Sequence, residues 1–164
     1  MNITALYADG GVISRNPSPI GGTWAWCHVN AAGERIATGS GVVLPRPSLP
    51  LITNNLTEMI ALVKGLEALP EGWAGTVYSD SQITIGRVFW GWKQNNLPAV
   101  LLRQCEAAIA RIDFANCRAV LLDGHPTQAQ LAAGRGKRGN PVSEHNVWCD
   151  KECGRVGSAG RVAA

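Results

Sequence analysis

The stretch Thr53-Asn54-Asn55-Leu56-Thr57-Glu58 opens the segment that decides the fold, and the segment continues to Leu69. Apolar residues recur in it at spacings of three and four, as on one face of a buried helix. They are Leu56, Met59, Ile60, Val63, Leu66 and Leu69. Pro70 and Gly72 end the pattern, so the sequence predicts a helix from Thr53 to Leu69. Glu58 lies one turn inside it, where a carboxylate either caps the helix or takes part in chemistry.

Strand-like segments lie on both sides of this helix. Three precede it, with turns short enough for an antiparallel meander: 3–9, 23–30 and 35–44. Two follow it, at 75–80 and 117–123, and the helical patterns around them cover 81–92, 98–112 and 143–155. The order β-β-β-α-β-α-α-β-α predicts an α/β fold with a mixed five-stranded sheet, three antiparallel strands and then parallel ones, flanked by helices. We expect residues 1–164 to form a single domain.

Composition narrows the class of protein. No apolar run reaches the roughly 18 residues that span a bilayer, and the start of the chain lacks the basic residues of a signal peptide. The five cysteines form no CxxC pair, which favours reduced thiols and a cytoplasmic protein away from membranes. A net charge of +3 permits nucleic-acid binding but does not argue for it.

Four of the 12 acidic residues fall at positions that matter for the topology. Asp9 and Asp80 end predicted strands, Glu58 lies in the first turn of the first helix, and Asp150 lies in the last helix. Ligands of α/β sheets bind at the carboxyl ends of strands. Carboxylates gathered there repel one another unless a cation neutralises them, and oxygen ligands suit Mg²⁺ or Mn²⁺. Two such ions can hold both the attacking water and the leaving oxygen of a phosphodiester during hydrolysis.

Each acid also has an ordinary structural interpretation. Asp9 with the following glycine fits a turn. Glu58 fits a capping box if Asn55 is the N-cap, and Asp80 fits the N-cap of the next helix. Asp150 fits a solvated helix position. Taken singly, none of these acids distinguishes a metal ligand from a capping or surface residue.

The motifs taken together resemble ribonuclease H of type 1 over nearly the full length of the chain. The matching stretches are Tyr7-Ala8-Asp9-Gly10, Asn16-Pro17 with Gly21-Gly22, Thr53-Asn54-Asn55 through Glu58, Ser79-Asp80-Ser81-Gln82, Gly124-His125, and Asn146 with Cys149-Asp150. The resemblance implies a ribonuclease H-like fold and an endonuclease that cleaves the RNA strand of RNA–DNA hybrids, leaving 5′-phosphate and 3′-hydroxyl ends. It also implies two Mg²⁺ or Mn²⁺ ions per active site with substrate bound.

The resemblance assigns a role to each catalytic position. Asp9 would bridge the two ions, and Glu58 and Asp80 would complete the ion nearer the leaving group. Asp150 would hold the ion that carries the nucleophilic water. His125 matches the family's mobile histidine, which assists proton transfer or product release, although a histidine in a Gly-His-Pro turn is also an ordinary surface residue.

Four amide residues match positions that contact the nucleic acid in this family: Asn16, Asn54, Asn55 and Gln82. Amides can bond the 2′-hydroxyl group, which separates RNA from DNA, and the base edges of the minor groove. The same side chains also suit helix and turn capping. The expected partner is therefore an RNA–DNA hybrid, bound by a monomer.

The chain departs from the family pattern in three places. Gly11 stands where the family often has Ser. The segment 91–96 is shorter than the basic handle that some family members have here, and it carries one Lys. The gap between His125 and Asp150 is longer than usual and contains the segment Gly134–Gly139, with Arg135, Lys137 and Arg138. We hypothesise that this flexible basic loop contacts phosphate; the alternative is a solvated loop without function.

Two further patterns have an ordinary and a functional interpretation. His145, Cys149 and Cys153 share one helical face, which fits core packing better than a zinc site because a fourth ligand is lacking. Trp90 and Trp92 fit the core. The resemblance implies an alternative, in which one of them stacks on the sugars of the DNA strand, as an aromatic residue does in the family.

Two other functions remain open at this point. They are a non-catalytic nucleic-acid-binding domain and a DNA-cutting nuclease on the same fold, since a fold alone does not determine function.

Overall fold

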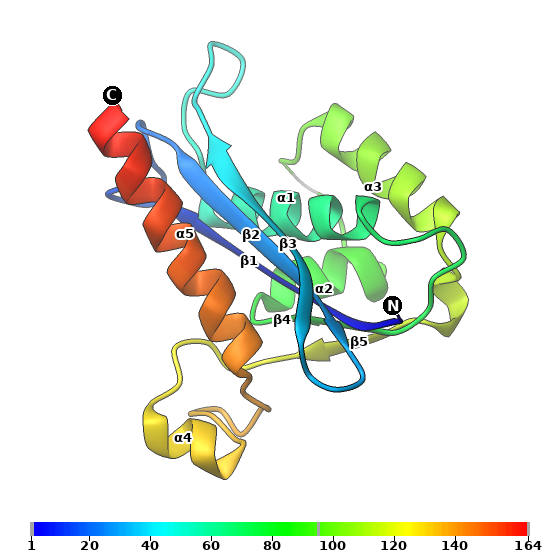
Figure 1. Cartoon of the computed structure of the whole chain (residues 1–164). Helices are drawn as coiled ribbons and strands as arrows, with labels where there is room; N and C mark the ends of the chain where they lie inside the picture. The colour runs from blue at the N-terminus through cyan, green and yellow to red at the C-terminus, as the bar shows by residue number, and fades with distance from the viewer. Residues whose placement is uncertain (1, 95, 164) are drawn as a thin grey trace.

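The computed structural model describes residues 2–94 and 96–163, and five strands form one mixed sheet in the order β3-β2-β1-β4-β5 (Figure 1). The antiparallel strands are β1 (Ile3–Val12), β2 (Gly22–Asn30) and β3 (Arg35–Val43). The strands β4 (Thr76–Ser79) and β5 (Arg118–Leu121) continue the sheet in parallel with β1. The predicted mixed five-stranded sheet is confirmed.

Helices cover both faces of this sheet (Figure 1). On one face lie α1 (Asn54–Glu67) and α2 (Gln82–Phe89), with α3 (Ala99–Arg111) packed against α1. On the other face lies α5 (Glu144–Ala163). Alternate residues of a strand point to opposite faces. Accordingly Leu6 packs with α1 residues in one core cluster, and Tyr7 packs with Cys149 of α5 in another.

The helical predictions hold in outline and fail in detail. Within α2, Ile85 is fully buried, but Ile83 is 39% exposed. The last helix does not stop near Arg155 but runs to Ala163. Glycines in this part of the sequence argue against a helix, yet Gly157 is buried, so tertiary packing outweighs helix propensity. Among the described residues, no helix is long and apolar enough to cross a bilayer.

Two short elements were not predicted from the sequence. One is the 3₁₀-helix η1 (Phe114–Asn116), just before β5. The other is α4 (Gln128–Ala133), which begins with a capping box between Thr127 and Gln130 and ends at Gly134 in the left-handed conformation. The segment between β5 and α5 is therefore folded and not a simple flexible loop.

Candidate active site

The hydrogen bonds of the helix ends test the capping interpretations of two acids. The N-cap of α1 is Thr53, whose Oγ1 accepts a hydrogen bond from the backbone N–H of Leu56 at 3.2 Å. The N-cap of α2 is Ser81, whose Oγ accepts from the N–H of Thr84 at 3.3 Å. The capping interpretations of Glu58 and Asp80 are therefore wrong, and both carboxylates are available for another role.

Asp9 does not lie in a turn either. The strand β1 continues past it to Val12, with Asp9 opposite Ala25 of β2. The N–H of Gly10 is directed at Asp9 Oδ1 (3.0 Å) and at Glu58 Oε2 (3.1 Å). One backbone donor thus connects the acid of β1 with the acid of α1.

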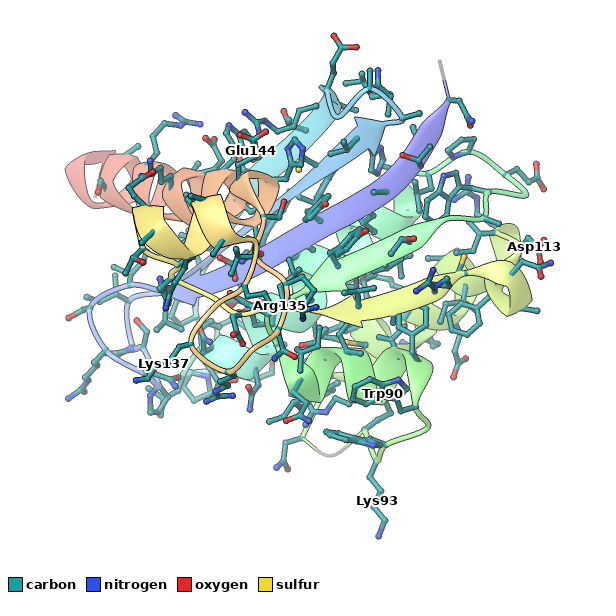
Figure 2. All side chains as sticks on the ribbon, turned by 90° about the horizontal axis from the view of Figure 1, so that it is seen from below. Trp90, Lys93, Asp113, Arg135, Lys137 and Glu144 are labelled. Carbon is teal, nitrogen blue, oxygen red and sulfur yellow. The ribbon has the colours of Figure 1, made fainter. Side chains whose placement is uncertain are left out.

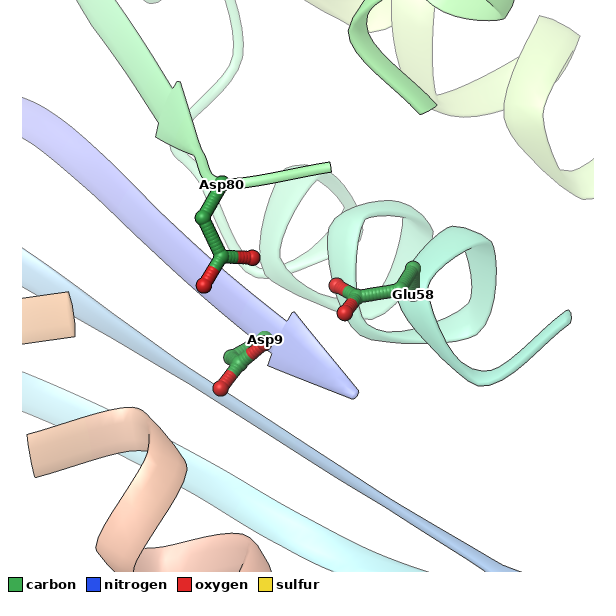
Figure 3. A group of neighbouring side chains, drawn as sticks. All are labelled: Asp9, Glu58 and Asp80. Atoms are coloured by element: carbon green, nitrogen blue, oxygen red, sulfur yellow. The ribbon is translucent and has the colours of Figure 1, made fainter. Parts of the chain in front are cut away.

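The carboxylates of Asp9, Glu58 and Asp80 converge near the carboxyl ends of β1 and β4 (Figure 3). One oxygen from each lies within 4.8 Å of the others. Asp9 and Glu58 are 4% and 5% exposed, and none of the ion pairs found among the described residues involves any of the three acids. Such a group needs protons or a bound cation to offset the repulsion between its charges.

Burial raises the pKa of each of these carboxyl groups. For Asp9, the negative charges of Asp80 and Asp150 raise the pKa further, and for Glu58 the charge of Asp9 does so. For Asp80, burial outweighs the hydrogen bond from Asn146, which acts in the opposite direction, and its pKa is also raised. Without a cation, the cluster therefore favours partial protonation.

Asp150, the fourth predicted ligand, lies at the edge of this cluster. Its side chain is 46% exposed on α5, and its Oδ2 lies 3.4 Å from Nδ1 of His125. The side chain of His125 is 82% exposed, and its backbone has a φ of 49°. The structure thus brings together Asp9, Glu58 and Asp80, and places Asp150 with His125 at the solvent side.

A cavity of about 980 Å³ opens over the carboxylates. Its lining includes all four predicted acids, His125 and three of the four predicted amides, Asn54, Asn55 and Gln82. Asn16 is not part of the lining. It is exposed, and its Oδ1 accepts a hydrogen bond from the backbone N–H of Asn54 at 3.1 Å, so it supports the start of α1.

Two buried polar residues near the cavity were given no role from the sequence. Asn146 is 2% exposed, and its Nδ2 donates to Oδ2 of Asp80 at 3.2 Å. Asp123 is 5% exposed at the end of β5 and lines the cavity. Like Asp9 and Asp80, it is an acid at the end of a predicted strand, and that position is the signal by which the sequence could have identified it.

The other candidate residues lie outside this cavity. His145, Cys149 and Cys153 are all buried, and the one metal-competent group found among the described residues does not include them. The Sγ of Cys149 lies near the carbonyl of Tyr7, so core packing explains this face of α5. Trp90 and Trp92 are 48% and 42% exposed and pack against each other after α2. The segment 91–96 includes one residue, 95, outside the described part of the chain.

Comparison with known proteins shows what this chain is similar to in sequence. No protein-family model matches the sequence. A ribonuclease H of Lachnoclostridium phytofermentans is 28% identical over 163 residues, which cover 90% of this chain and 99% of that protein. A ribonuclease H of Syntrophus aciditrophicus is 37% identical over 89 residues, and this match covers 54% of the chain and less than half, 45%, of that protein.

The fold has solved counterparts. The structure of LC11-RNase H1 in complex with an RNA/DNA hybrid superposes with a TM-score of 0.62 at 18% identity, covering 96% of this chain and 98% of that one. The mixed five-stranded sheet and this likeness show an α/β fold of the ribonuclease H-like class. The sequence relatives named ribonuclease H, together with this ribonuclease H1 structure, support a ribonuclease H family protein.

Proposed function

We propose that this protein is a metal-dependent endoribonuclease that hydrolyses the RNA strand of RNA–DNA hybrids and leaves 5′-phosphate and 3′-hydroxyl ends. The observation that carries the proposal is the convergence of Asp9, Glu58 and Asp80 within 4.8 Å at the base of a large open cavity. The names of its sequence relatives and the hybrid bound by LC11-RNase H1 support it. The proposal treats residues 1–164 as one ribonuclease H domain that acts as a cytoplasmic monomer.

The residues present fit Mg²⁺ or Mn²⁺. The donors are carboxylate oxygens, two of the three acids are buried, and no cationic side chain pairs with them in the described part of the chain. Asp9, Glu58 and Asp80 would hold the cation, and Asp150 would hold a second one at the solvent side. Two such ions would supply charge neutralisation and Lewis-acid chemistry for hydrolysis of the phosphodiester.

The protein's own groups orient this site. The N–H of Gly10 fixes Asp9 and Glu58 relative to each other, and the amide of Asn146 fixes Asp80. Each ligand therefore has a second partner that restricts its rotation, as in other metal sites. His125 is exposed next to Asp150, in a position to accept a proton or to assist the departure of the product.

We assign the selection of RNA over DNA to the amide side chains on the cavity wall. Asn54 and Asn55 begin α1 and Gln82 begins α2, so rigid helices hold all three at the cavity. Each amide offers both a donor and an acceptor, as the 2′-hydroxyl group requires. We assign Asn16 an indirect role through its hydrogen bond to the backbone of Asn54.

A cleavage assay tests the proposed function. We expect cleavage of a labelled RNA–DNA hybrid in Mg²⁺ or Mn²⁺, no cleavage of double-stranded RNA or DNA, and loss of all cleavage in Asp9→Asn. Cleavage of double-stranded DNA would instead identify a DNA nuclease. Binding of the hybrid without cleavage in either metal would identify a non-catalytic domain on the same fold.

Once metal has been removed, the melting temperature of the protein is expected to fall as the pH rises. The pKa values of Asp9, Glu58 and Asp80 are raised in the folded state, so the native protein binds more protons than the unfolded chain above the ordinary carboxyl range. Stability is then greatest below about pH 4, the unfolded-state pKa, and is lost as the pH rises through the folded-state values.

Melting curves in EDTA and in Mg²⁺, from acidic to neutral pH, measure this effect. Mg²⁺ should raise the melting temperature most at neutral pH, where the acids are ionised. Asp9→Asn should flatten the pH dependence in EDTA because it removes one of the coupled acids. A metal-free melting temperature that depends on pH equally in Asp9→Asn and in the wild type would contradict the expectation.

A further inference from the structure

The basic segment between α4 and α5 is a closed turn at the cavity rim. Its arms are joined by a bridge between Arg135 and Pro141, and the N–H of Gly136 donates to the carbonyl of Asn140 at 2.9 Å. The N–H of Gly139 donates to the carbonyl of Gly136 at 3.1 Å, which closes a four-residue β-turn. The tip of this turn is therefore formed by residues 137 and 138.

A single carboxylate anchors this turn. Asp123 Oδ2 accepts from the N–H groups of Arg138 (2.7 Å) and Asn140 (3.2 Å), and its Oδ1 accepts from Asn140 Nδ2 (3.0 Å). The backbone lies so close that a Cβ on Gly136 would be 2.4 Å from the Cβ of Asp123. Burial acts to raise the pKa of Asp123. These hydrogen bonds together have the larger effect, so the pKa lies below the ordinary value of an aspartic acid. The anchor thus stays ionised at neutral pH.

The anchored turn presents two positive charges to the cavity. Lys137 and Arg138 are exposed, and they are the only Lys or Arg side chains among the described residues of its lining. Figure 2 shows Lys137 on this turn, well separated from Trp90 and Lys93 beyond α2. Arg135 of the same segment is not in the lining, and its Nη1 donates to the carbonyl of Gly139 within the turn.

We propose that Lys137 and Arg138 bind the sugar–phosphate backbone of the nucleic acid next to the carboxylate cluster, and that Asp123 is the positioning residue that holds them there. This inference rests on the proposed function, because it names the group that grips the same substrate. The cavity floor carries acids that repel a polyanion, so cations on the rim are needed to bind the phosphates that flank the cleaved bond. The turn would also compensate for the short segment 91–96.

Binding measurements without metal test the turn independently of catalysis. The affinity of the metal-free protein for an RNA–DNA hybrid is measured by fluorescence anisotropy over a series of salt concentrations. Each lost phosphate contact lowers the steepness of log K against log salt by about 0.9. Lys137→Ala with Arg138→Ala should therefore lower the slope by about 2 and weaken binding roughly tenfold or more at low salt.

A control variant separates the two contacts from net charge. Arg103→Ala with Arg118→Ala removes the same charge from exposed positions that do not line the cavity. The slope of this control should differ from that of the wild type by no more than about 0.9, the effect of one phosphate contact. Equal slopes for the two double variants, or no binding of the hybrid by the intact protein at low salt, would overturn the inference.

The positioning role of Asp123 has its own readouts. Asp123→Asn should speed amide hydrogen exchange at residues 136–140 and reduce the salt slope as the Lys137/Arg138 double variant does. Adding it to that double variant should reduce the slope no further, since both act through the same contacts. A further reduction in the triple variant would mean that Asp123 does not act through these two cations.

These results can be told apart from those of the cleavage assay. If the hybrid is bound but not cleaved, a reduced slope in the Lys137/Arg138 variant still supports the turn and the nuclease proposal alone fails. If the hybrid is cleaved and the slope is unchanged, the turn proposal alone fails.

Discussion

Glu58→Gln is expected to abolish cleavage of the hybrid without lowering the free energy of unfolding of the metal-free protein. Charge stabilisation by a bound metal contributes several kcal/mol to hydrolysis, and about 4 kcal/mol is a thousandfold in rate. Loss of one of three converging ligands should therefore lower kcat by roughly a thousandfold or more. Single-turnover cleavage with saturating enzyme in Mg²⁺ measures the loss directly.

The stability half of this prediction follows from the surroundings of Glu58. Gln has nearly the same shape and keeps a carbonyl oxygen for the N–H of Gly10, which bonds Oε2 of Glu58 at 3.1 Å. It removes a buried charge whose pKa is raised by burial and by Asp9. Urea unfolding in EDTA at neutral pH should thus show a stability equal to or above that of the wild type.

Thr53→Ala is the matched control, because it removes the true cap of the same helix. It should lower the free energy of unfolding by about 1 kcal/mol and leave the carboxylate cluster in place. If Glu58→Gln were instead to destabilise the protein while the folded fraction cleaved normally, Glu58 would be a structural residue. Its assignment as a metal ligand would then be wrong.

Periodicity was enough to predict much of the fold and the positions of three acids of the candidate site. The spacing of apolar residues around Glu58 predicts a helix with that acid near its start, and strand patterns place Asp9 and Asp80 at strand ends. Because β1 and β4 pair in parallel, their carboxyl ends meet at one edge of the sheet. The pairing of these strands therefore brings Asp9 and Asp80 together, before any side-chain detail is known.

What the sequence did not predict depends on contacts between distant segments. The N–H groups that Asp123 accepts from lie 15 and 17 residues further along the chain, and no local pattern reveals them. The length of α5 depends on its packing against the sheet, not on the helix propensity of its glycines. The place of Asp150 at the edge of the carboxylate cluster follows from where α5 crosses the sheet, which spacing within one helix cannot give.

Gly10→Ala is expected to lower the stability of the fold more than a methyl group added at any other glycine near the site. A Cβ at this position would lie 2.4 Å from the backbone nitrogen of Glu58, 2.4 Å from the carbonyl carbon of Thr57 and 2.6 Å from Thr57 Oγ1. Two of these three atoms belong to the backbone of α1, which cannot rotate away as a side chain can. The strand and the helix must separate locally, and overpacking of this kind costs about 3 kcal/mol.

The same change should remove activity in the protein that remains folded. The N–H of Gly10 holds Asp9 and Glu58 together, so separating β1 from α1 moves two metal ligands apart. Urea unfolding gives the loss of stability, and cleavage at a temperature well below the melting point gives the loss of activity. Mg²⁺ should also raise the melting temperature less than it does in the wild type.

Gly154→Ala is the control for adding a methyl group. Gly154 is at an exposed position of α5, and a Cβ there would meet no atom within 4 Å beyond the neighbouring backbone of its own helix. Replacing Gly by Ala inside a helix should therefore stabilise the protein by about 0.5 to 1 kcal/mol. Gly10→Ala could instead prove as stable and as active as Gly154→Ala. In that case β1 and α1 would separate at this point without loss of stability. Their close approach would then not be what fixes the distance between Asp9 and Glu58.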